Sequence, residues 1–320
     1  MGPGGGRGVA RTPIAGTRRR SVEVQGAAPA RDVPVARGGG EPGRSRQGAL
    51  PLPVHPGGAR ALLGAREGRA VKAALLIPVY QHGEPVARVL EDLAGLGMTC
   101  FMIDDGSDGE NRERLLKLAV EHPFVSLHRL PANAGKGVAL RTGFRLAAHR
   151  GYTHVVHLDA DGQHCCADVP RFLAAMEAHP EALVLGTPLF DDSVPRPRLA
   201  FRQLSRGLVW LATLSFAVED PLVGFRGVPL APTLALLDRV KTGDHMEFEP
   251  ELAVRLVWAG TPMVNLPTRV VYPVGGHSNF DVLWDDLRLA WLYLRLAFGM
   301  FLRSPLLLWR RPVAIPAEGP

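Results

Sequence analysis

The chain has 320 residues, of which 46% are hydrophobic and 21% charged, and its formal net charge at pH 7 is +6. The first 70 residues hold 12 Arg against four acidic residues (+8), so residues 71–320 sum to about −2. Because the positive charge belongs to the N-terminal segment, the rest of the chain lacks the basic surface that nucleic-acid binding requires, and we expect no nucleic-acid partner.

The N-terminal segment, residues 1–70, is rich in Gly, Pro, Ala and Arg, with almost no aromatic or periodic apolar content. Such a segment cannot bury enough apolar surface to offset the entropy that ordering costs, so we expect a disordered tail. The remaining chain is long enough for one α/β domain with an addition at its C-terminus. We place this domain at residues 71–275.

From residue 71 to about residue 190, short apolar runs alternate with segments of helical apolar spacing. The run at 73–79 predicts a buried strand, and a helix is expected at 85–96. The elements expected next are strand 100–103, helix 110–122, strand 125–128, helix 136–150, strand 154–158, a helix capped by Asp168, and strand 182–185. Alternation with short connections predicts an α/β fold with a mostly parallel sheet and helices on both faces.

After residue 190 the pattern changes. We expect a helix at 196–218 with basic residues in its first half, then a turn-rich loop at 220–226. A helix at 249–259 and a strand at 263–272 follow.

Asp159-Ala160-Asp161 comes directly after the expected strand at 154–158. Two carboxylates this close raise each other's pKa unless a cation lies between them, and their oxygens suit Mg²⁺ or Mn²⁺ completed by substrate phosphates. Asp104-Asp105 ends an earlier strand, and ligands of parallel sheets bind beyond the carboxyl ends of the strands. The sequence therefore predicts one nucleotide-binding edge of the sheet.

Two other phosphate or metal motifs do not fit the spacing. An EF-hand loop that begins at Asp159 would need Glu where Pro170 stands. A P-loop that ends at Lys136 would need Gly where Leu130 stands.

Five motifs, in this order, resemble those of the family 2 glycosyltransferases, which have the GT-A nucleotide-diphospho-sugar transferase fold. They are Ile77-Pro78-Val79-Tyr80, Asp104-Asp105-Gly106-Ser107, Asn133-x-Gly135-Lys136-Gly137, Asp159-Ala160-Asp161-Gly162-Gln163-His164, and Asp220 with Gly224-Phe225-Arg226. The resemblance covers about residues 73–275, and the last two motifs look most like polyprenyl-phosphate mannose and glucose synthases of the dolichyl-phosphate mannose synthase type. The C-terminus is also similar to glycosyltransferases of bacterial aryl-polyene clusters.

The resemblance implies a donor site for a nucleoside-diphosphate sugar. Its nucleotide-sugar-binding residues would be Pro78, Tyr80, Asp104, Asp105, Lys136, Arg141 and Asp159. Among them, Asp105 would accept a hydrogen bond from the nucleobase, and Lys136 and Arg141 would lie near the phosphates or ribose. The metal, Mg²⁺ or Mn²⁺, would be held by Asp159, Asp161 and Gln163.

The resemblance also implies an acceptor site. Arg202, Ser205 and Arg206 stand where the synthases bind the phosphate of a lipid acceptor. That phosphate is already ionised, so transfer to it needs no general base. Transfer to a hydroxyl would need one, with Asp220, Glu247 and Glu249 as candidates; we take Asp161, Asp220 and Glu249 as the catalytic residues.

Residues 276–320 are expected to form an amphipathic helix and a tail. Around 282–303, five charged residues fall within an arc of about 80° on a helical wheel, and the rest of the surface is apolar except for Asp286. These charged residues are Asp281, Asp285, Arg288, Arg295 and Arg303. Since no uncharged stretch reaches the length of a membrane span, we expect a helix lying in the bilayer interface. A helix packed on the protein's own core is the alternative.

Together these features predict an inverting glycosyltransferase with a membrane lipid acceptor, polyprenyl phosphate first among the candidates. We expect it to be peripheral, at the cytoplasmic face of the inner or plasma membrane. One alternative is a non-catalytic, membrane-associated partner protein, which Gln81-His82 favours because the family commonly has Asn-Glu there. Another, a sugar-phosphate nucleotidyltransferase, lacks its Gly-rich loop after the first strand.

Overall fold

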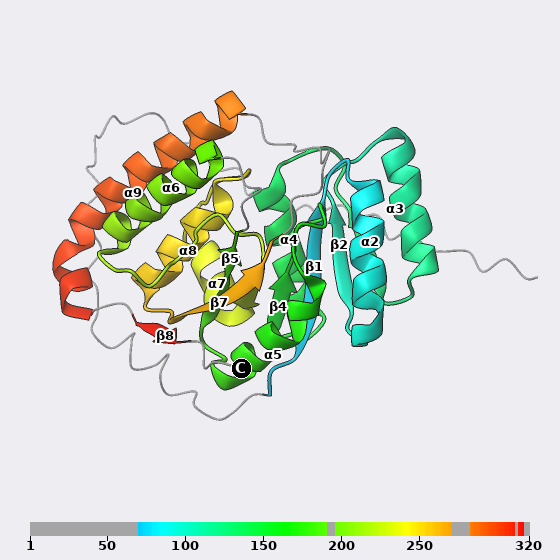
Figure 1. Ribbon diagram of the computed structural model, residues 1–320, viewed down its shortest axis with the longest axis horizontal. Helices are drawn as coiled ribbons and strands as arrows, with labels where there is room; N and C mark the ends of the chain where they lie inside the picture. The colour runs from blue at the N-terminus through cyan, green and yellow to red at the C-terminus, as the bar shows by residue number, and fades with distance from the viewer. Residues whose placement is uncertain (1–69, 191–195, 271–281, 311–312, 317–320) are drawn as a thin grey trace, which may run out of the picture. The chain divides into compact units, whose positions relative to one another are not determined.

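The computed structural model describes residues 70–190, 196–270, 282–310 and 313–316, all within the compact unit Glu67–Pro320 (Figure 1). The expected N-terminal tail lies outside the described residues. So do residues 271–281, which include the end of the expected strand at 263–272.

The described residues form one eight-stranded sheet with the order β3-β2-β1-β4-β6-β5-β7-β8. The strands are β1 Ala73–Val79, β2 Cys100–Asp104, β3 Val125–Arg129, β4 His154–His157, β5 Leu183–Leu189, β6 Arg226–Pro229, β7 Met263–Arg269 and β8 Ala314–Pro316. Only β6 is antiparallel to its neighbours, β4 and β5. The expected α/β fold with a mostly parallel sheet is confirmed.

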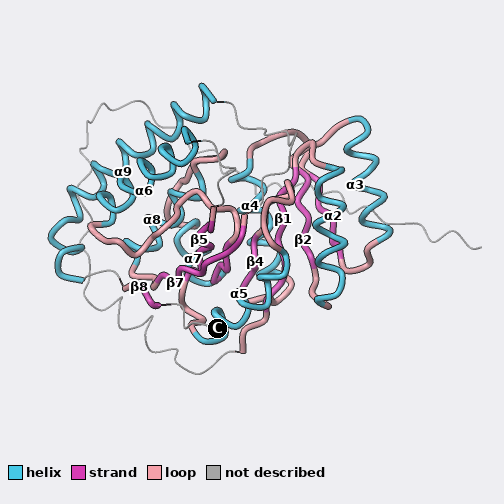
Figure 2. The backbone as a smooth tube through the Cα atoms, viewed as in Figure 1, coloured by secondary structure: helices cyan, strands magenta, loops and turns pink. Residues whose placement is uncertain are grey.

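Helices cover both faces of this sheet (Figure 2). They are α2 Gly83–Leu93, α3 Gly109–Glu121, α4 Lys136–His149, α5 Val169–Ala178, α6 Arg196–Thr213, α7 Leu230–Leu237, α8 Phe248–Ala259 and α9 Val282–Arg310, with short 3-10 turns at Ala94–Leu96 and Cys166–Asp168. Helices α2, α3 and α5 pack on one face, and the others pack on the second.

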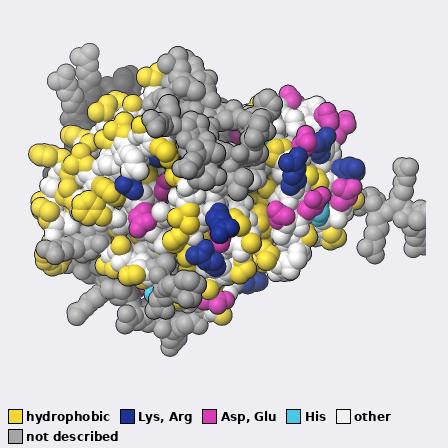
Figure 3. Space-filling model, viewed as in Figure 1, with side chains coloured by type: hydrophobic (Ala, Val, Ile, Leu, Met, Phe, Trp, Pro, Cys, Tyr) yellow, Lys and Arg dark blue, Asp and Glu magenta, His cyan; other side chains and the backbone are white. Residues whose placement is uncertain are grey.

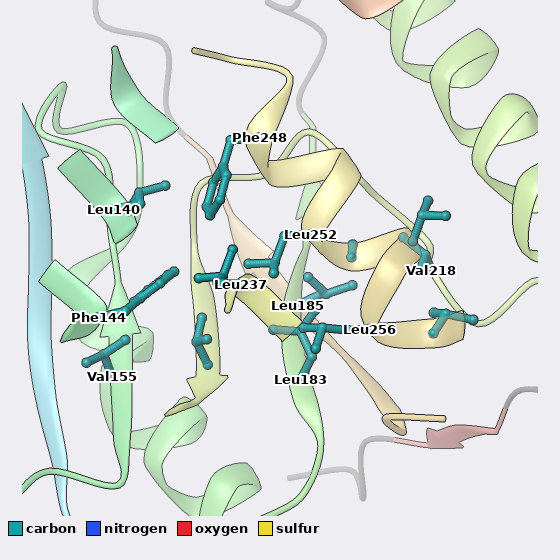
Figure 4. Packing of buried hydrophobic residues seen from close by; sticks show 14 of the residues in the cluster. Leu140, Phe144, Val155, Leu183, Leu185, Val218, Leu237, Phe248, Leu252 and Leu256 are labelled. Carbon is teal, nitrogen blue, oxygen red and sulfur yellow. The ribbon is translucent and has the colours of Figure 1, made fainter. Parts of the chain in front are cut away.

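The two faces follow from the alternation of side chains along each strand. In β1, Leu75 and Ile77 enter the core under α2, α3 and α5, whereas Ala74 and Leu76 enter the opposite core. Figure 4 shows this second core, in which Phe144 of α4 and side chains of α8 pack with side chains from the strands. The long apolar runs of the sequence are therefore strands buried on both sides.

Three local expectations were wrong. Helix α6 ends at Thr213, five residues before 218, because Leu214 adopts a left-handed φ of 50°. The loop expected at 220–226 is followed by β6 and α7, which the sequence analysis missed. Asp168 precedes α5, but its carboxylate accepts from the Thr268 hydroxyl at 2.6 Å and caps no helical N–H.

Gly143 of α4 allows the helix to approach β1. A Cβ at this position would lie 2.2 Å from Cδ1 and 3.1 Å from Cγ of the fully buried Leu76. Because this core has no room for the side chain to move, we expect Gly143→Ala to lower the free energy of unfolding by about 1–3 kcal/mol. Gly207→Ala is the control, since a Cβ there meets nothing within 4 Å and should raise stability by up to about 1 kcal/mol. Urea unfolding of both variants tests this, and equal effects would contradict it.

Candidate active site

The motifs meet at one edge of the sheet. Strands β1, β2 and β4 end there, and β6 begins there because it is antiparallel, with Arg226 paired to His157. The loop at 220–226 is thereby brought beside Asp159-Ala160-Asp161. Gly224 lies so close that a Cβ on it would be 1.9 Å from the Asp159 carboxylate.

Asp104 and Asp105 hold the turns of this edge together. Asp104 forms an ion pair with Arg129 and accepts a hydrogen bond from the Ser107 N–H at 2.8 Å. The Asp105 carboxylate accepts from the N–H groups of Ala134 and Gly135, both at 2.8 Å. Burial raises the pKa of Asp105, and these two bonds oppose the shift. Both carboxylates are nearly enclosed, so a nucleobase could reach Asp105 only at the lone pairs that remain.

The glycines of the Asn133–Gly137 motif make room for a neighbouring loop. A Cβ at Gly135, whose φ is 101°, would lie 2.3 Å from the Asp244 carbonyl oxygen. The Gly137 N–H donates to the same carbonyl at 2.8 Å. Arg141 binds this loop as well, with Nη1 donating to the Gly243 carbonyl at 2.7 Å and an ion pair to Asp244. The first turn of α4 and Arg141 therefore bind the protein's own loop.

Lys136 lies between two carboxylates. Its ammonium is 2.6 Å from an Asp159 oxygen and 2.6 Å from a Glu249 oxygen. Burial alone would lower the pKa of Lys136, but the two carboxylates outweigh burial and raise it. Lys136, expected near the donor's phosphates, thus neutralises the first carboxylate of the Asp-Ala-Asp motif.

A second cation lies beneath this group. Arg226 is fully buried and donates to the carbonyls of Pro221, Val223 and Glu249 at 2.7–2.8 Å. Its Nε lies 3.7 Å from the Glu249 carboxylate. The buried carboxylate of Glu249 and the partly exposed carboxylate of Asp159 are therefore matched by two cations.

His157 and His164 complete this network. His157 sits 3.5 Å from Asp159 and 3.6 Å from Glu249. Burial lowers the pKa of His157, so it is neutral near pH 7. His164 Nε2 lies 3.5 Å from the other Asp159 oxygen. Sequence reasoning gave neither histidine a role.

Asp161 lies outside the network. Its carboxylate accepts from the Gln163 N–H at 3.0 Å, and no Lys or Arg of the described residues pairs with it. Burial and the nearby Asp159 charge raise the pKa of Asp161. A cation at this carboxylate would remove both penalties.

The donor set fits a divalent cation that depends on its substrate. In the described part of the chain, no group of three or more His, Cys, Asp or Glu side chains is placed to hold a metal. Mg²⁺ in nucleotide sites commonly takes one or two carboxylates and completes its shell with phosphates and water. Asp161, with Asp159 and Gln163 beside it, matches that sparse set.

The expected acceptor residues lie on one face of α6. Arg202 pairs with Asp220 at 2.5 Å, and its guanidinium lies over the Phe190 ring. Ser205 is buried, and Arg206 stacks on Trp210 at 4.7 Å. Asp220 and Gly224 belong to one short loop, which connects this group to Asp159.

The other expected residues are placed as follows. Pro78 is buried in β1, and Tyr80 follows that strand half-buried. The Glu247 carboxylate accepts from the Asp244 N–H at 3.1 Å. Glu249, one of the expected catalytic residues, lies beneath Asp159 with 4% of its surface exposed.

Residues 74–225 match the family model described as Glycosyl transferase family 2, and this segment is a family 2 glycosyltransferase domain. The chain is similar to the glycosyltransferase AglJ of Haloferax volcanii, with 25% identity over 217 residues, covering 66% of this chain and 67% of that protein. It is also similar to undecaprenyl-phosphate mannosyltransferase of Micrococcus luteus, with 26% identity over 216 residues, covering 64% and 86%.

Among solved structures, the mannosyltransferase PcManGT of Pyrobaculum calidifontis, in complex with GDP-Man and Mn²⁺, is similar with a TM-score of 0.49 and 17% identity. The match covers 77% of this chain and 70% of that chain.

Arg226 should be essential for the buried network. Arg226→Met removes the cation beside Glu249 and the hydrogen-bond donor to three buried carbonyl groups. We therefore expect the free energy of unfolding to fall by about 3–5 kcal/mol. The control is Arg145→Met, which breaks the exposed pair with Asp238 at 3.1 Å and should cost at most about 1 kcal/mol. Thermal and urea unfolding measure both, and a loss for Arg226→Met no larger than the control's would contradict the assignment.

Proposed function

We propose that this chain transfers a sugar from a nucleoside-diphosphate sugar, with inversion, to the phosphate of a polyprenyl lipid at the membrane surface. The observation that carries the proposal is the unequal state of the two aspartates. Asp159 is neutralised by Lys136, whereas no Lys or Arg in the described part of the chain forms an ion pair with Asp161 beside it. A metal-bound diphosphate supplies what Asp161 lacks.

Asp161, with Asp159 and Gln163, would hold Mg²⁺ or Mn²⁺. When bound, such a cation neutralises charge on the departing diphosphate. The chain's own residues fix the geometry: Lys136 orients Asp159, and Gly224 leaves the Asp159 carboxylate room at the edge of the sheet. In the transfer, an acceptor oxygen bonds to the anomeric carbon from the face opposite the diphosphate, and the nucleoside diphosphate leaves with the electron pair of the broken bond.

A phosphate acceptor suits this site better than a hydroxyl. Glu249 is buried and paired with Lys136, and Asp220 is paired with Arg202, so both carboxylates are already bound by cations of the chain. An ionised phosphate needs no base, and a guanidinium such as that of Arg202 binds phosphate well. The similarity to the undecaprenyl-phosphate mannosyltransferase of Micrococcus luteus supports this choice.

Two arginines of α9 contact side chains of α8. Arg295 lies 3.3 Å from the fully buried Glu251 of α8, and the Arg303 guanidinium stacks on Trp258 at 4.7 Å. Leu292 and Leu296 are buried on the same side. The inner face of α9 therefore packs on the protein's core, which was the alternative to the interface helix.

The outer face of α9 is apolar. Its exposed residues are Leu287, Trp291, Leu294, Phe298, Phe301, Leu302, Leu308 and Trp309. Helix α6 beside it adds the exposed Leu204 and Leu211, and hydrophobic side chains gather over both helices in Figure 3. An exposed apolar surface of this kind, rich in aromatic residues, marks a membrane or protein contact.

We propose that this outer face rests on the bilayer and attaches the enzyme peripherally. By length and composition alone, Leu287–Trp309 could also cross a membrane. The sequence analysis argued against a span because of the charged residues, but the three arginines of this segment do not exclude one. The ion pair between Arg295 and Glu251 and the buried inner face favour attachment at the surface. A span would have to give up both.

Asp161→Asn should abolish turnover without unfolding the protein. Loss of the carboxylate removes the metal position, which is worth several kcal/mol in the transition state, so we expect the rate to fall at least about 100-fold. Release of UDP, GDP or dTDP from a panel of their sugars is measured with Mn²⁺ and a polyprenyl phosphate, with Asp238→Asn as surface control. Full activity of Asp161→Asn, or no release by the wild-type chain from any sugar, would contradict the proposed function.

Leu294→Lys with Phe298→Glu should reduce membrane binding while the fold is kept, because both side chains are exposed, at 65% and 67%. We expect at least about a tenfold loss of co-sedimentation with vesicles of phosphatidylglycerol and phosphatidylethanolamine, since each buried apolar side chain contributes about 1.5–3 kcal/mol. Val120→Lys on α3 is the matched control, with 65% exposure. Equal sedimentation of both proteins would contradict docking through α9.

A further inference from the structure

Two buried hydroxyl groups face one another between α6 and α9. Ser205 of α6 is 1% exposed and Tyr293 of α9 is 8% exposed. Neither hydroxyl oxygen has a hydrogen-bond partner of normal geometry in the described residues. Leaving a buried polar group unsatisfied costs about 1–3 kcal/mol, and native proteins seldom keep two such groups together without a use.

The two hydroxyls adjoin the pair of Arg202 and Asp220. Arg202 and Ser205 are three residues apart on α6 and therefore share one face of the helix. Burial raises the pKa of Tyr293 to about 12; the nearby Ser205 hydroxyl opposes the shift and the Asp220 charge adds to it. Four polar groups from three segments, namely α6, the loop before β6, and α9, thus converge at one place.

Arg202 is the most exposed of these four groups. The side chain of Arg202 keeps 21% of its surface exposed and that of Asp220 keeps 9%, while the two hydroxyls lie further inside. The guanidinium is held by one carboxylate oxygen, Oδ2, and the other, Oδ1, accepts from the Leu222 N–H at 2.8 Å. Asp220 is therefore fixed by its own loop, whereas the guanidinium at the surface has further N–H groups to offer an anion.

We propose that Tyr293 is part of the acceptor site: its hydroxyl, with that of Ser205, donates to the phosphate of the acceptor lipid that Arg202 attracts. The inference rests on the proposed function and extends it, because it makes α9 a part of the binding site as well as a membrane contact. Tyr293 is placed by the buried face of α9, and the outer face of the same helix meets the bilayer. The lipid's phosphate would thus be bound where its chain leaves the membrane.

The test compares Tyr293→Phe and Ser205→Ala in the full chain. Both substitutions remove only the hydroxyl. The probes are geranylgeranyl phosphate and geranylgeraniol in detergent micelles, with affinities measured by microscale thermophoresis. Because a hydrogen bond to a charged group is worth about tenfold in affinity or more, we expect each variant to lose about tenfold for the phosphate and little for the alcohol.

Thr233→Val is the matched control, because the Thr233 hydroxyl of α7 is also fully buried and has no hydrogen-bond partner among the described residues. It should change neither affinity. Nucleotide binding, measured with GDP and UDP, should be equal in all variants and reports that the fold is intact.

The results distinguish the role of Tyr293 from the identity of the acceptor. If the wild-type chain prefers the phosphate and Tyr293→Phe keeps that preference in full, the role of Tyr293 is overturned and the proposed function stands. If the wild-type chain binds the phosphate no better than the alcohol, the phosphate acceptor of the proposed function is overturned, and the inference with it.

Discussion

The position of Lys136 between Asp159 and Glu249 determines how this active site is arranged. Three segments that are distant in sequence, the start of α4, the end of β4 and the start of α8, are joined by one ammonium group at 2.6 Å from each carboxylate. Removing charges from water is costly, and the cost is recovered only when each charge is matched. Arg226 provides the rest of that match. Asp161, the other carboxylate of the motif, forms no ion pair with a Lys or Arg of the described residues, and this is why we propose it as a metal ligand.

The sequence was sufficient for the fold up to residue 190, because buried parallel strands and amphipathic helices leave unmistakable apolar runs. Strand β1 was predicted with its bounds at 73–79. Strand β6 was missed because its four residues, including Arg226 and Gly227, carry no apolar run. What identifies β6 as a strand is pairing to β4 and β5, which is a property of the tertiary structure.

The site was predictable in its location but not in its contacts. Aspartates at strand ends had to meet at one edge, whatever their partners. Lys136 and Arg141 were expected to face the donor, but the structure pairs both with carboxylates of the chain itself. No local pattern encodes such a pairing, since Glu249 and Asp244 come from loops and helices more than 100 residues further along the chain. Tyr293 was overlooked for the same reason.

The C-terminal helix α9 has two apolar faces, one packed on the domain and one exposed. On a helical wheel, the charged arc of α9 suggests a face turned toward water. Charged side chains need water, however, only where the protein offers them no polar or aromatic partner. Glu251 and Trp258 of α8 provide such partners for Arg295 and Arg303, so these two arginines contact the domain while the exposed side chains of the outer face are apolar. A helix of this kind is held to its domain by polar contacts as well as by buried leucines. Since it also carries Tyr293 on its inner face, the proposed docking on a bilayer and the proposed binding of an acceptor phosphate would both depend on this one helix.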